Sequence, residues 1–261
     1  MDTIGAICYM ITQKQQTLQI LLKDLEEYEY GNLNLHIRTG SSDIVVCNDN
    51  FKEPYWKHLV PGDYWLDLGG YVGSSALVFL RAGAKHVFSV DADPVHVMLY
   101  KNNLELNGYD PDILCAAIVG RRTRSIQDFS INVRNSSKLN VAANTLYADK
   151  RWKTARPTIP VPVIEFVELC DYVGHRYGDG MWSLKSDIEG AELDILLYCD
   201  LSMFSQLFVE YHFEIHKEFS LVRKVVNRLK ETGWNVIHRK IPEDKEICDF
   251  WPFFFTIYGT R

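Results

Sequence analysis

The stretch from Tyr64 to Ser75 constrains the fold of this chain more than any other. Residues 65–68 form a short and mostly apolar run, which is typical of a buried strand in a parallel sheet. Three glycines follow within residues 69–73, and a helix is expected from Ser74 to Ala82. Because glycine lets bare backbone approach a ligand, the sequence predicts an open α/β sheet with a small-molecule site beyond this strand.

The glycine turn does not have the spacing of a dinucleotide-binding loop. A Gly-x-Gly-x-x-Gly motif that begins at Gly69 would need glycines where Tyr71 and Ser74 stand. Asp67, at the end of the strand, would attract a cationic amine and repel a pyrophosphate. Asp91 ends the next predicted strand, where a carboxylate can accept hydrogen bonds from both hydroxyls of a ribose.

The glycine loop is one of six motifs that follow one another between about residue 35 and about residue 215. The motifs are Arg38-Thr-Gly-Ser-Ser-Asp43, Asp67-Leu-Gly-Gly-Tyr-Val-Gly73, Val90-Asp-Ala-Asp-Pro94, Asn102-Asn-Leu-Glu-Leu-Asn-Gly108, Cys115-Ala-Ala-Ile-Val-Gly120 and Leu184-Lys-Ser-Asp-Ile-Glu-Gly-Ala-Glu192. In this order they resemble the FkbM-type branch of the class I S-adenosylmethionine-dependent methyltransferases. The chain departs from that pattern at Gly70-Tyr71, where the family usually has Ala-Asn, and at Asp91-Ala92, where it usually has Glu followed by Pro.

The resemblance implies a Rossmann-like, doubly wound α/β fold with a seven-stranded, mostly parallel sheet and an antiparallel last strand. It also implies an O-methyltransferase that transfers a methyl group from S-adenosyl-L-methionine to a hydroxyl of a sugar, a glycan or a hydroxylated small molecule. Two alternatives stay open: a nucleic-acid (RNA) methyltransferase, and a non-catalytic binding module with this fold. The expected cofactor-binding residues are Asp67, Gly69, Gly70, Tyr71, Gly73, Asp91, Ala92, Ala117 and Asp187.

Length and composition favour one large α/β domain with a small additional layer. The chain has 261 residues, of which 47% are hydrophobic, enough for a full core. We expect an N-terminal extension over residues 1–60 that packs on a methyltransferase domain over residues 61–261. Within that domain, residues 121–160 are expected to form a basic, lid-like insertion.

The N-terminal extension is expected to contain a helix and a β-hairpin. Alternation predicts a strand over residues 33–37, with residues 43–47 as its partner. Arg38 and Asp43 flank the turn between them and would either pair with each other or face a substrate. Helical spacing before Tyr28 is found for four leucines: Leu18, Leu21, Leu22 and Leu25.

Charge is unevenly distributed along the chain. The formal net charge is -6, which argues against general binding of nucleic acid. Residues 121–156 nevertheless hold nine basic residues against two acidic ones, so this stretch carries +7. It is either a solvated insertion that balances an acidic body, or a lid that presents cations to an anionic acceptor such as a nucleotide-linked sugar.

Other features favour a soluble, cytoplasmic protein. No apolar run is long enough to span a membrane, and residues 1–30 lack the pattern of a secretory signal. The six cysteines contain no Cys-x-x-Cys pair, which favours free thiols and disfavours a zinc site. A small-molecule or glycan acceptor is the expected partner, no membrane partner is expected, and nothing in the sequence indicates an oligomeric state.

Three acidic residues lie at the end of a later predicted strand and just after it. Asp187 ends the strand over residues 181–187, where ligands sit in an open parallel sheet, and could hold the amine of the cofactor or orient an acceptor hydroxyl. Glu189 and Glu192 are expected in the first turn of the next helix, where acids favour the helix dipole and cap free amides. Glu189 is a catalytic candidate, whereas Glu192 is expected to be structural.

The following predicted strand, residues 206–213, ends beside the same crevice. Alternation places Glu210 and His212 on one of its faces. His212 could act as the base that takes a proton from an alcohol, and His216 is a weaker candidate. A less favoured alternative is a divalent metal, Mg²⁺ or Mn²⁺, held by Asp187, Glu210 and His212.

The last part of the chain is expected to close the sheet. Residues 234–238 and 253–258 have the composition of two strands, and the second would insert antiparallel. The aromatic run that begins at Trp251 is expected in the core, with Trp251 at its rim as the alternative.

Overall fold

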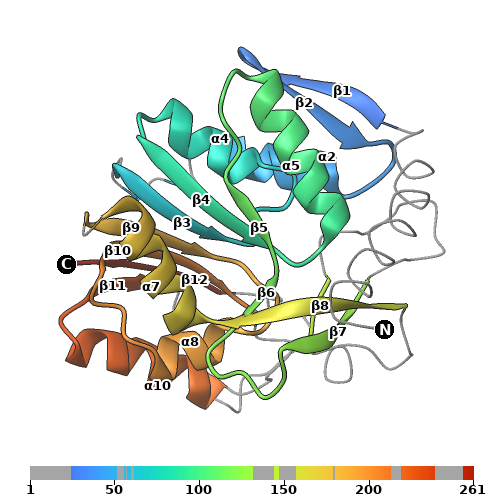
Figure 1. Cartoon of the computed structure of the whole chain (residues 1–261). Helices are drawn as coiled ribbons and strands as arrows, with labels where there is room; N and C mark the ends of the chain where they lie inside the picture. The colour runs from blue at the N-terminus through green and yellow to red at the C-terminus, as the bar shows by residue number, and fades with distance from the viewer. Residues whose placement is uncertain are drawn as a thin grey trace.

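The fold is built around one seven-stranded, mostly parallel sheet with helices on both faces (Figure 1). In spatial order the strands are β11 (Asn235–His238), β12 (Phe255–Thr260), β10 (Phe204–Tyr211), β9 (Trp182–Ser186), β3 (Tyr64–Leu68), β4 (His86–Asp91) and β5 (Ile113–Cys115). Neighbouring strands from β10 to β5 are parallel, and β12 is antiparallel to both β10 and β11. This is the Rossmann-like α/β arrangement that was predicted. The computed structural model describes residues 25–51, 56, 58–59, 62–131, 144–146, 157–178, 180–212, 219–238 and 255–261.

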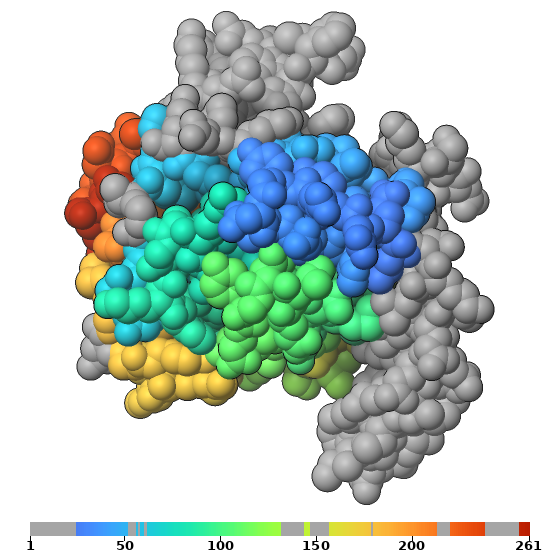
Figure 2. All heavy atoms as spheres, turned by 90° about the horizontal axis from the view of Figure 1, so that it is seen from above, coloured from blue at the N-terminus to red at the C-terminus, as the bar shows by residue number. Residues whose placement is uncertain are grey.

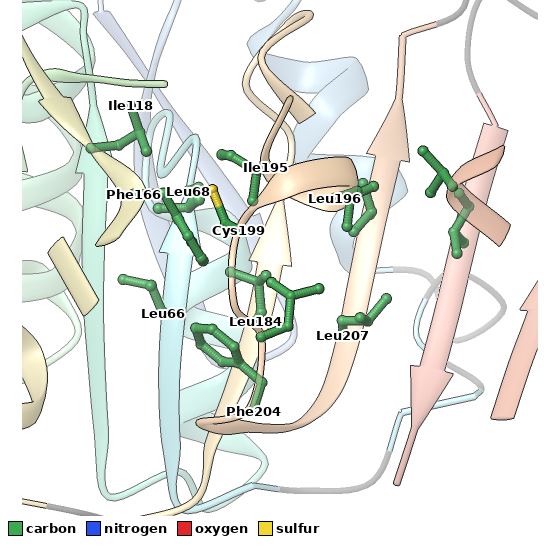
Figure 3. Close-up of a cluster of buried hydrophobic side chains, with 14 of the residues drawn as sticks. Leu66, Leu68, Ile118, Phe166, Leu184, Ile195, Leu196, Cys199, Phe204 and Leu207 are labelled. Atoms are coloured by element: carbon green, nitrogen blue, oxygen red, sulfur yellow. The ribbon is translucent and has the colours of Figure 1, made fainter. Parts of the chain in front are cut away.

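Two hydrophobic cores, one on each face of the sheet, hold the helices in place. On one face, Leu66, Leu184 and Leu207 of the sheet pack with Ile195 and Leu196 (Figure 3). Side chains alternate along a strand, so the neighbouring strand positions pack on the other face. The helices of the first face are α7 (Phe166–Tyr177), α8 (Glu192–Tyr198) and α10 (Phe219–Glu231). Those of the second are α2 (Asp43–Phe51), α4 (Ser74–Arg81) and α5 (Pro94–Leu106).

An N-terminal hairpin lies against α5. Strand β1 (Leu25–Tyr30) pairs antiparallel with β2 (Leu33–Arg38) across a two-residue turn, in which Gly31 has a φ of 63°. The backbone N–H of His36 donates to the amide oxygen of Asn103 in α5 at 2.7 Å. Figure 2 shows the hairpin in blue beside α5 in green. The extension therefore packs on the helices that flank the glycine loop.

The strand predicted to pair with β2 was wrong. Residues 43–47 were expected to form a strand, but they begin helix α2. Three β-branched residues at positions 44–46 suggested a strand, yet Asp43, Cys47 and Phe51 are buried at helical spacing. The strand that pairs with β2 precedes it in the sequence instead of following it.

A second, three-stranded sheet branches from the main one. Its order is β6 (Ala117–Val119), β8 (Thr158–Glu165) and β7 (Ile126–Ser130). The third strand of the main sheet was predicted over residues 113–117, but it ends at Cys115, and Ala117 already belongs to β6. The connection between the two sheets thus runs along the edge where ligands are expected.

Several predictions fall outside the described residues. These are the helix before Leu25, most of the basic insertion (residues 132–143 and 147–156), His216 and Trp251. Leu25 itself lies in β1 and not in a helix. Among the described helices, none is both long and apolar enough to cross a membrane.

Candidate cofactor and acceptor site

A cavity of about 250 Å³ opens at the carboxyl ends of β3, β4, β9 and β10. Its volume is slightly below the ~300–1,000 Å³ that is typical of small-molecule sites. In a parallel sheet this edge brings together residues that follow different strands. On the sheet side the cavity is lined by Gly69, Tyr71, Asp91, Ala92, Ala116, Ala117, Asp187, Glu189 and Glu210.

The glycine loop is packed tightly against backbone. Gly69 has a φ of 83°, and a Cβ atom there would lie 1.9 Å from the carbonyl oxygen of Asp187. The N–H groups of Gly69 and Gly70 both donate to the carbonyl of Val90, at 2.8 and 3.1 Å. Gly70 and Gly73, both expected to contact the cofactor, pack against Tyr100 and are not in the described lining. Their small size serves the packing of the loop on α5.

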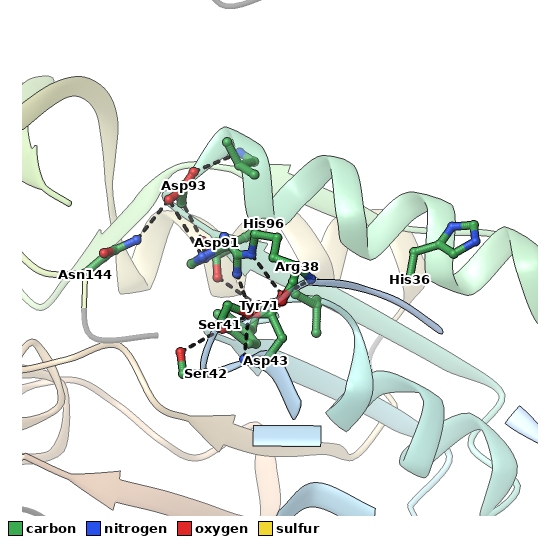
Figure 4. Close-up of polar contacts among 12 residues, drawn as sticks. His36, Arg38, Ser41, Ser42, Asp43, Tyr71, Asp91, Asp93, His96 and Asn144 are labelled. Atoms are coloured by element: carbon green, nitrogen blue, oxygen red, sulfur yellow. Dashed lines mark hydrogen bonds and ion pairs between the residues drawn. The ribbon is translucent and has the colours of Figure 1, made fainter. Parts of the chain in front are cut away.

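Asp91 lines the cavity but already accepts several hydrogen bonds (Figure 4). Its Oδ1 accepts from the backbone N–H of Asp93 at 2.8 Å and contacts Nδ1 of His96 at 3.1 Å, and its Oδ2 accepts from the N–H of Tyr71 at 2.9 Å. Burial alone would raise the pKa of Asp91, but His96 and the backbone donors lower it. The side-chain amide of Asn144 donates to Asp93 at 2.9 Å. These contacts fix the orientation of the Asp91 side chain and favour its ionised form.

His96 was not predicted as part of this site. Its side chain is buried between two carboxylates, with Nε2 at 3.7 Å from Oδ2 of Asp93. Burial lowers the pKa of His96, but the charges of Asp93 and Asp91 outweigh that effect and raise it. In the sequence, only the spacing of five residues after Asp91 on a predicted helix could have suggested this contact.

A buried ion pair connects the N-terminal extension to the glycine loop. Nε and Nη2 of Arg38 donate to the two carboxylate oxygens of Asp43 at 2.9 and 2.7 Å, so the predicted pairing of these residues is confirmed. The hydroxyl of Tyr71 also donates to Asp43, and the guanidinium of Arg38 lies 5.5 Å from the Tyr71 ring centre (Figure 4). Burial would raise the pKa of Asp43, but Arg38 lowers it. Tyr71, with a φ of 49°, is therefore fixed from both its backbone and its hydroxyl.

Asp67 lies beneath the glycine loop and not in the described cavity lining. It is fully buried, accepts from the hydroxyl of Ser75 at 2.8 Å and contacts Nζ of Lys185 at 3.2 Å. Lys185, which the sequence reasoning did not assign to the site, does line the cavity and donates to the carbonyl of Gly69 at 2.6 Å. Burial would lower the pKa of Lys185, but Asp67 and Asp187 raise it, so its ammonium stays charged under the loop.

One wall of the cavity is apolar. It contains Ala116, Ala117 and Ile118 from the link between the two sheets, together with Phe129 of β7 and Ile188. Such a wall suits a flat aromatic ring. Ala116 and Ala117 were predicted to pack against the adenine ring. Phe129 was not predicted, because it comes from the second sheet, which the alternation of strands and helices did not indicate.

The opposite wall is formed by the ends of β9 and β10. Ser186 pairs with Val209 in the register of these parallel strands, so Asp187 and Glu210 follow the last paired positions of β9 and β10 as neighbours. His212 lies two residues further along and returns to the face of Glu210, as alternation predicted. The side chain of His212 is only 4% exposed and sits just behind the cavity wall.

Four carboxylates surround the imidazole of His212. Its Nε2 lies 3.1 Å from Glu189, 3.6 Å from Asp187 and 3.9 Å from Glu210, and its Nδ1 lies 3.0 Å from Glu192. Burial lowers the pKa of His212, but the charges of Glu189 and Glu192 raise it well above its ordinary value. These charges favour the protonated imidazole, and the role of His212 as the base stays a prediction.

Glu192 is the most buried member of this cluster. It accepts from the N–H groups of Ile188 and Gly190, both at 2.8 Å, as the predicted cap of α8. Glu189 was expected in the first turn of that helix, but it precedes the helix and has a φ of 57°. A non-glycine residue in this region is strained and is often found at functional sites. The strain places the Glu189 carboxylate beside His212.

Comparison with known proteins identifies similar solved structures only. No family model matches the chain, and no curated protein matches it. A ribosomal protein L11 methylase from Lactobacillus delbrueckii subsp. bulgaricus is 13% identical, with 78% of this chain and 72% of that one covered and a TM-score of 0.40. An O-methyltransferase from Bacillus cereus, solved with S-adenosylhomocysteine, is 8% identical, with 84% and 78% covered and a TM-score of 0.43.

A third similar structure is longer than this chain. It is a tRNA (uracil-54, C5)-methyltransferase from Pyrococcus abyssi, solved with S-adenosyl-L-homocysteine, at 10% identity and a TM-score of 0.42. The alignment covers 91% of this chain but only 43% of that protein. These neighbours are methyltransferases that act on different classes of acceptor. All three TM-scores are below 0.5, so these similarities do not indicate a function for this chain.

Proposed function

We propose that the protein is a class I, FkbM-type methyltransferase that transfers a methyl group from S-adenosylmethionine to a hydroxyl oxygen. The observation that carries the proposal is a single cavity that runs from a ribose-type carboxylate, Asp91, past the glycine loop to the acidic cluster around His212. The end at Asp91 has groups that can bind a nucleoside, and the end at His212 has groups that can accept or donate a proton.

The residues of the cavity fit the cofactor. The apolar wall would take the adenine ring, and Asp91 would accept from the ribose hydroxyls on the side that its present partners leave open to the cavity. The close approach of Gly69 to Asp187 leaves no room for a side chain between the loop and the acceptor wall. Asp187, which is 30% exposed, is the carboxylate best placed to hold the cofactor's amine. Asp67 would contribute indirectly, by holding Lys185 under the loop.

S-adenosylmethionine, when bound, supplies a methyl group on a positively charged sulfur. The cavity walls would align an acceptor oxygen with that carbon and exclude water, and this alignment supplies most of the rate. We propose that Glu189 accepts the hydroxyl proton as the carbon–oxygen bond forms and the carbon–sulfur bond breaks, with the electron pair left on sulfur. Its strained backbone and its 14% exposed side chain on the cavity wall support this role better than His212, whose side chain is only 4% exposed.

A hydroxylated and uncharged acceptor, such as a sugar or glycan, suits the described wall. Asp187, Glu189 and Glu210 all line it, and carboxylates accept hydrogen bonds from hydroxyl groups. The same negative charges would repel the phosphates of a nucleic acid. The basic stretch at 121–156, which could favour an anionic acceptor, lies mostly outside the described residues.

The test is transfer of labelled methyl groups from S-adenosylmethionine to a panel of sugars, nucleotide-sugars, hydroxylated small molecules and unmodified tRNA, with products identified by mass spectrometry. Methylation of a sugar hydroxyl is the expected result. Glu189→Gln should lower kcat by about 10²–10⁴-fold, as for loss of a general base, with little change in cofactor affinity. Methylation of tRNA, or of a nitrogen or carbon atom, would contradict the proposal.

A further inference from the structure

We infer that Asp187, Glu210 and His212 form a binding site for one divalent cation of the Mn²⁺ type. The inference deepens the proposed function, on which its catalytic meaning rests, because the site lies on the acceptor wall of the same cavity. Binding of the cation itself does not depend on that function.

The three side chains have the geometry of a ligand set. Each offers one ligand atom, and these atoms all lie within 4.8 Å of one another. Nε2 of His212 lies 3.6 Å from Asp187 and 3.9 Å from Glu210. Metal–ligand bonds of about 2.0–2.2 Å place neighbouring ligand atoms about 3–4 Å apart, so one ion can reach all three with small adjustments.

The imidazole is also held as a metal-binding histidine usually is. Metal-binding histidines almost always give their second ring nitrogen to a carboxylate or a carbonyl. Here Nδ1 of His212 is bound to Glu192 at 3.0 Å, and Glu192 is 1% exposed and fixed by two backbone N–H groups. This contact turns Nε2 toward Asp187 and Glu210. With Nδ1 held in this way, Nε2 is the nitrogen that can exchange its proton for a bound cation.

The position of the site gives the cation a role. Asp187 and Glu210 line the cavity, so an ion between them would have open positions toward an acceptor hydroxyl. The ion would use Oδ1 of Asp187, which faces His212, and leave Oδ2 for the cofactor's amine. A bound cation lowers the pKa of a coordinated hydroxyl and so helps Glu189 to take its proton. Two carboxylates and one imidazole favour Mn²⁺ over Ca²⁺, which prefers a shell of oxygens.

The experiment is a titration of the full chain with Mn²⁺, followed by electron paramagnetic resonance, with no methyl donor or acceptor present. We expect one Mn²⁺ per chain, tighter binding of Mn²⁺ than of Ca²⁺, and a ¹⁴N coupling from one imidazole that disappears in His212→Gln. Glu210→Gln, whose side chain is partly exposed, should weaken Mn²⁺ at least about tenfold, and Glu192→Gln about 10–100-fold through the orientation of His212.

Asp194→Asn is the matched control, because it removes one negative charge from the first turn of α8 without touching the cluster. It should leave Mn²⁺ affinity unchanged. Absence of saturable binding, a spectrum without ¹⁴N coupling, or equal weakening by Asp194→Asn and Glu210→Gln would each overturn the inference. Methyl transfer by a protein that binds no Mn²⁺ would contradict the metal site alone, whereas Mn²⁺ binding without any transfer would contradict the proposed function alone.

Discussion

Replacement of Gly69 by alanine should disrupt the junction between the two halves of the cavity. The added Cβ would lie 1.9 Å from the carbonyl oxygen of Asp187 and 3.5 Å from Nζ of Lys185. The first of these contacts is with backbone, so rotation of a side chain cannot relieve it. Either the glycine loop or the end of β9 must move, and both carry residues of the proposed site.

The size of the effect can be separated into two parts. A left-handed φ costs an alanine about 1–2 kcal/mol, and overpacking in a filled region costs typically about 1–3 kcal/mol more. Gly69→Ala should therefore lower the free energy of unfolding by about 2–5 kcal/mol. Gly108→Ala is the matched control, because Gly108 has a φ of 78°, close to the 83° of Gly69, and nothing within 4 Å of its Cβ position. Its cost should be the first part alone, about 1–2 kcal/mol.

Urea unfolding of both variants and titration with S-adenosylhomocysteine would measure these effects. We expect Gly69→Ala to be less stable than Gly108→Ala by the cost of overpacking, about 1–3 kcal/mol. Gly69→Ala should also lose cofactor affinity, while Gly108→Ala keeps the affinity of the parent protein. Equal stability of the two variants would show that the loop can move away freely. An unchanged affinity in Gly69→Ala would refute the idea that this junction shapes the cofactor site.

Three further changes test the buried polar contacts. Arg38→Met should cost about 3–5 kcal/mol in urea unfolding, because it leaves the carboxylate of Asp43 buried without its cationic partner. Tyr71→Phe removes one hydrogen bond to the same carboxylate and should cost about 1–3 kcal/mol. His96→Gln should alter the pH dependence of the melting temperature. The pKa of His96 is raised in the folded protein, so its stabilising effect is full below about pH 6.5 and fades as the pH rises through the folded value.

Each of these predictions has an outcome that would contradict it. An Arg38→Met protein as stable as its parent would show that Asp43 finds another partner. A Tyr71→Phe cost equal to that of Arg38→Met would show that the hydroxyl, and not the guanidinium, keeps the carboxylate buried. For His96→Gln, the difference in melting temperature from the parent should be largest near pH 6 and shrink toward pH 9, and a difference that grows over this range would contradict the assigned ion pair.

The central sheet could be predicted because its signals are local. Apolar runs such as residues 65–68 and 182–184 alternate with helical patterns, and each acid at a strand end follows directly from the order of a parallel sheet. The hairpin error shows where local signals fail. Positions 44–46 are β-branched and suggest a strand, but the contact of Asp43 with Tyr71 and the burial of Cys47 and Phe51 in the core are tertiary and select the helix.

The carboxylates of the candidate site could be predicted from the sequence, but the residues that contact them could not. Asp91, Asp187, Glu210 and His212 were all expected along one edge, and the structure brings ligand atoms of the last three within 4.8 Å of one another. That His96 would bind Asp91 depends on the packing of α5, which the five-residue spacing between them does not fix by itself. The raised pKa of His212 likewise comes from Glu189, Glu192 and Asp187, which approach the imidazole from the turn between β9 and the start of α8.

The most direct test of the account is a calorimetric titration of the purified protein with S-adenosylhomocysteine, compared with Asp91→Asn. The account predicts saturable binding at one site per chain. Asp91→Asn keeps the shape of the side chain but removes its charge, and it should weaken binding by about 10–100-fold, as for loss of a hydrogen bond to a charged group. Folded protein that does not bind S-adenosylhomocysteine, or that binds it equally well without the Asp91 carboxylate, would contradict the account.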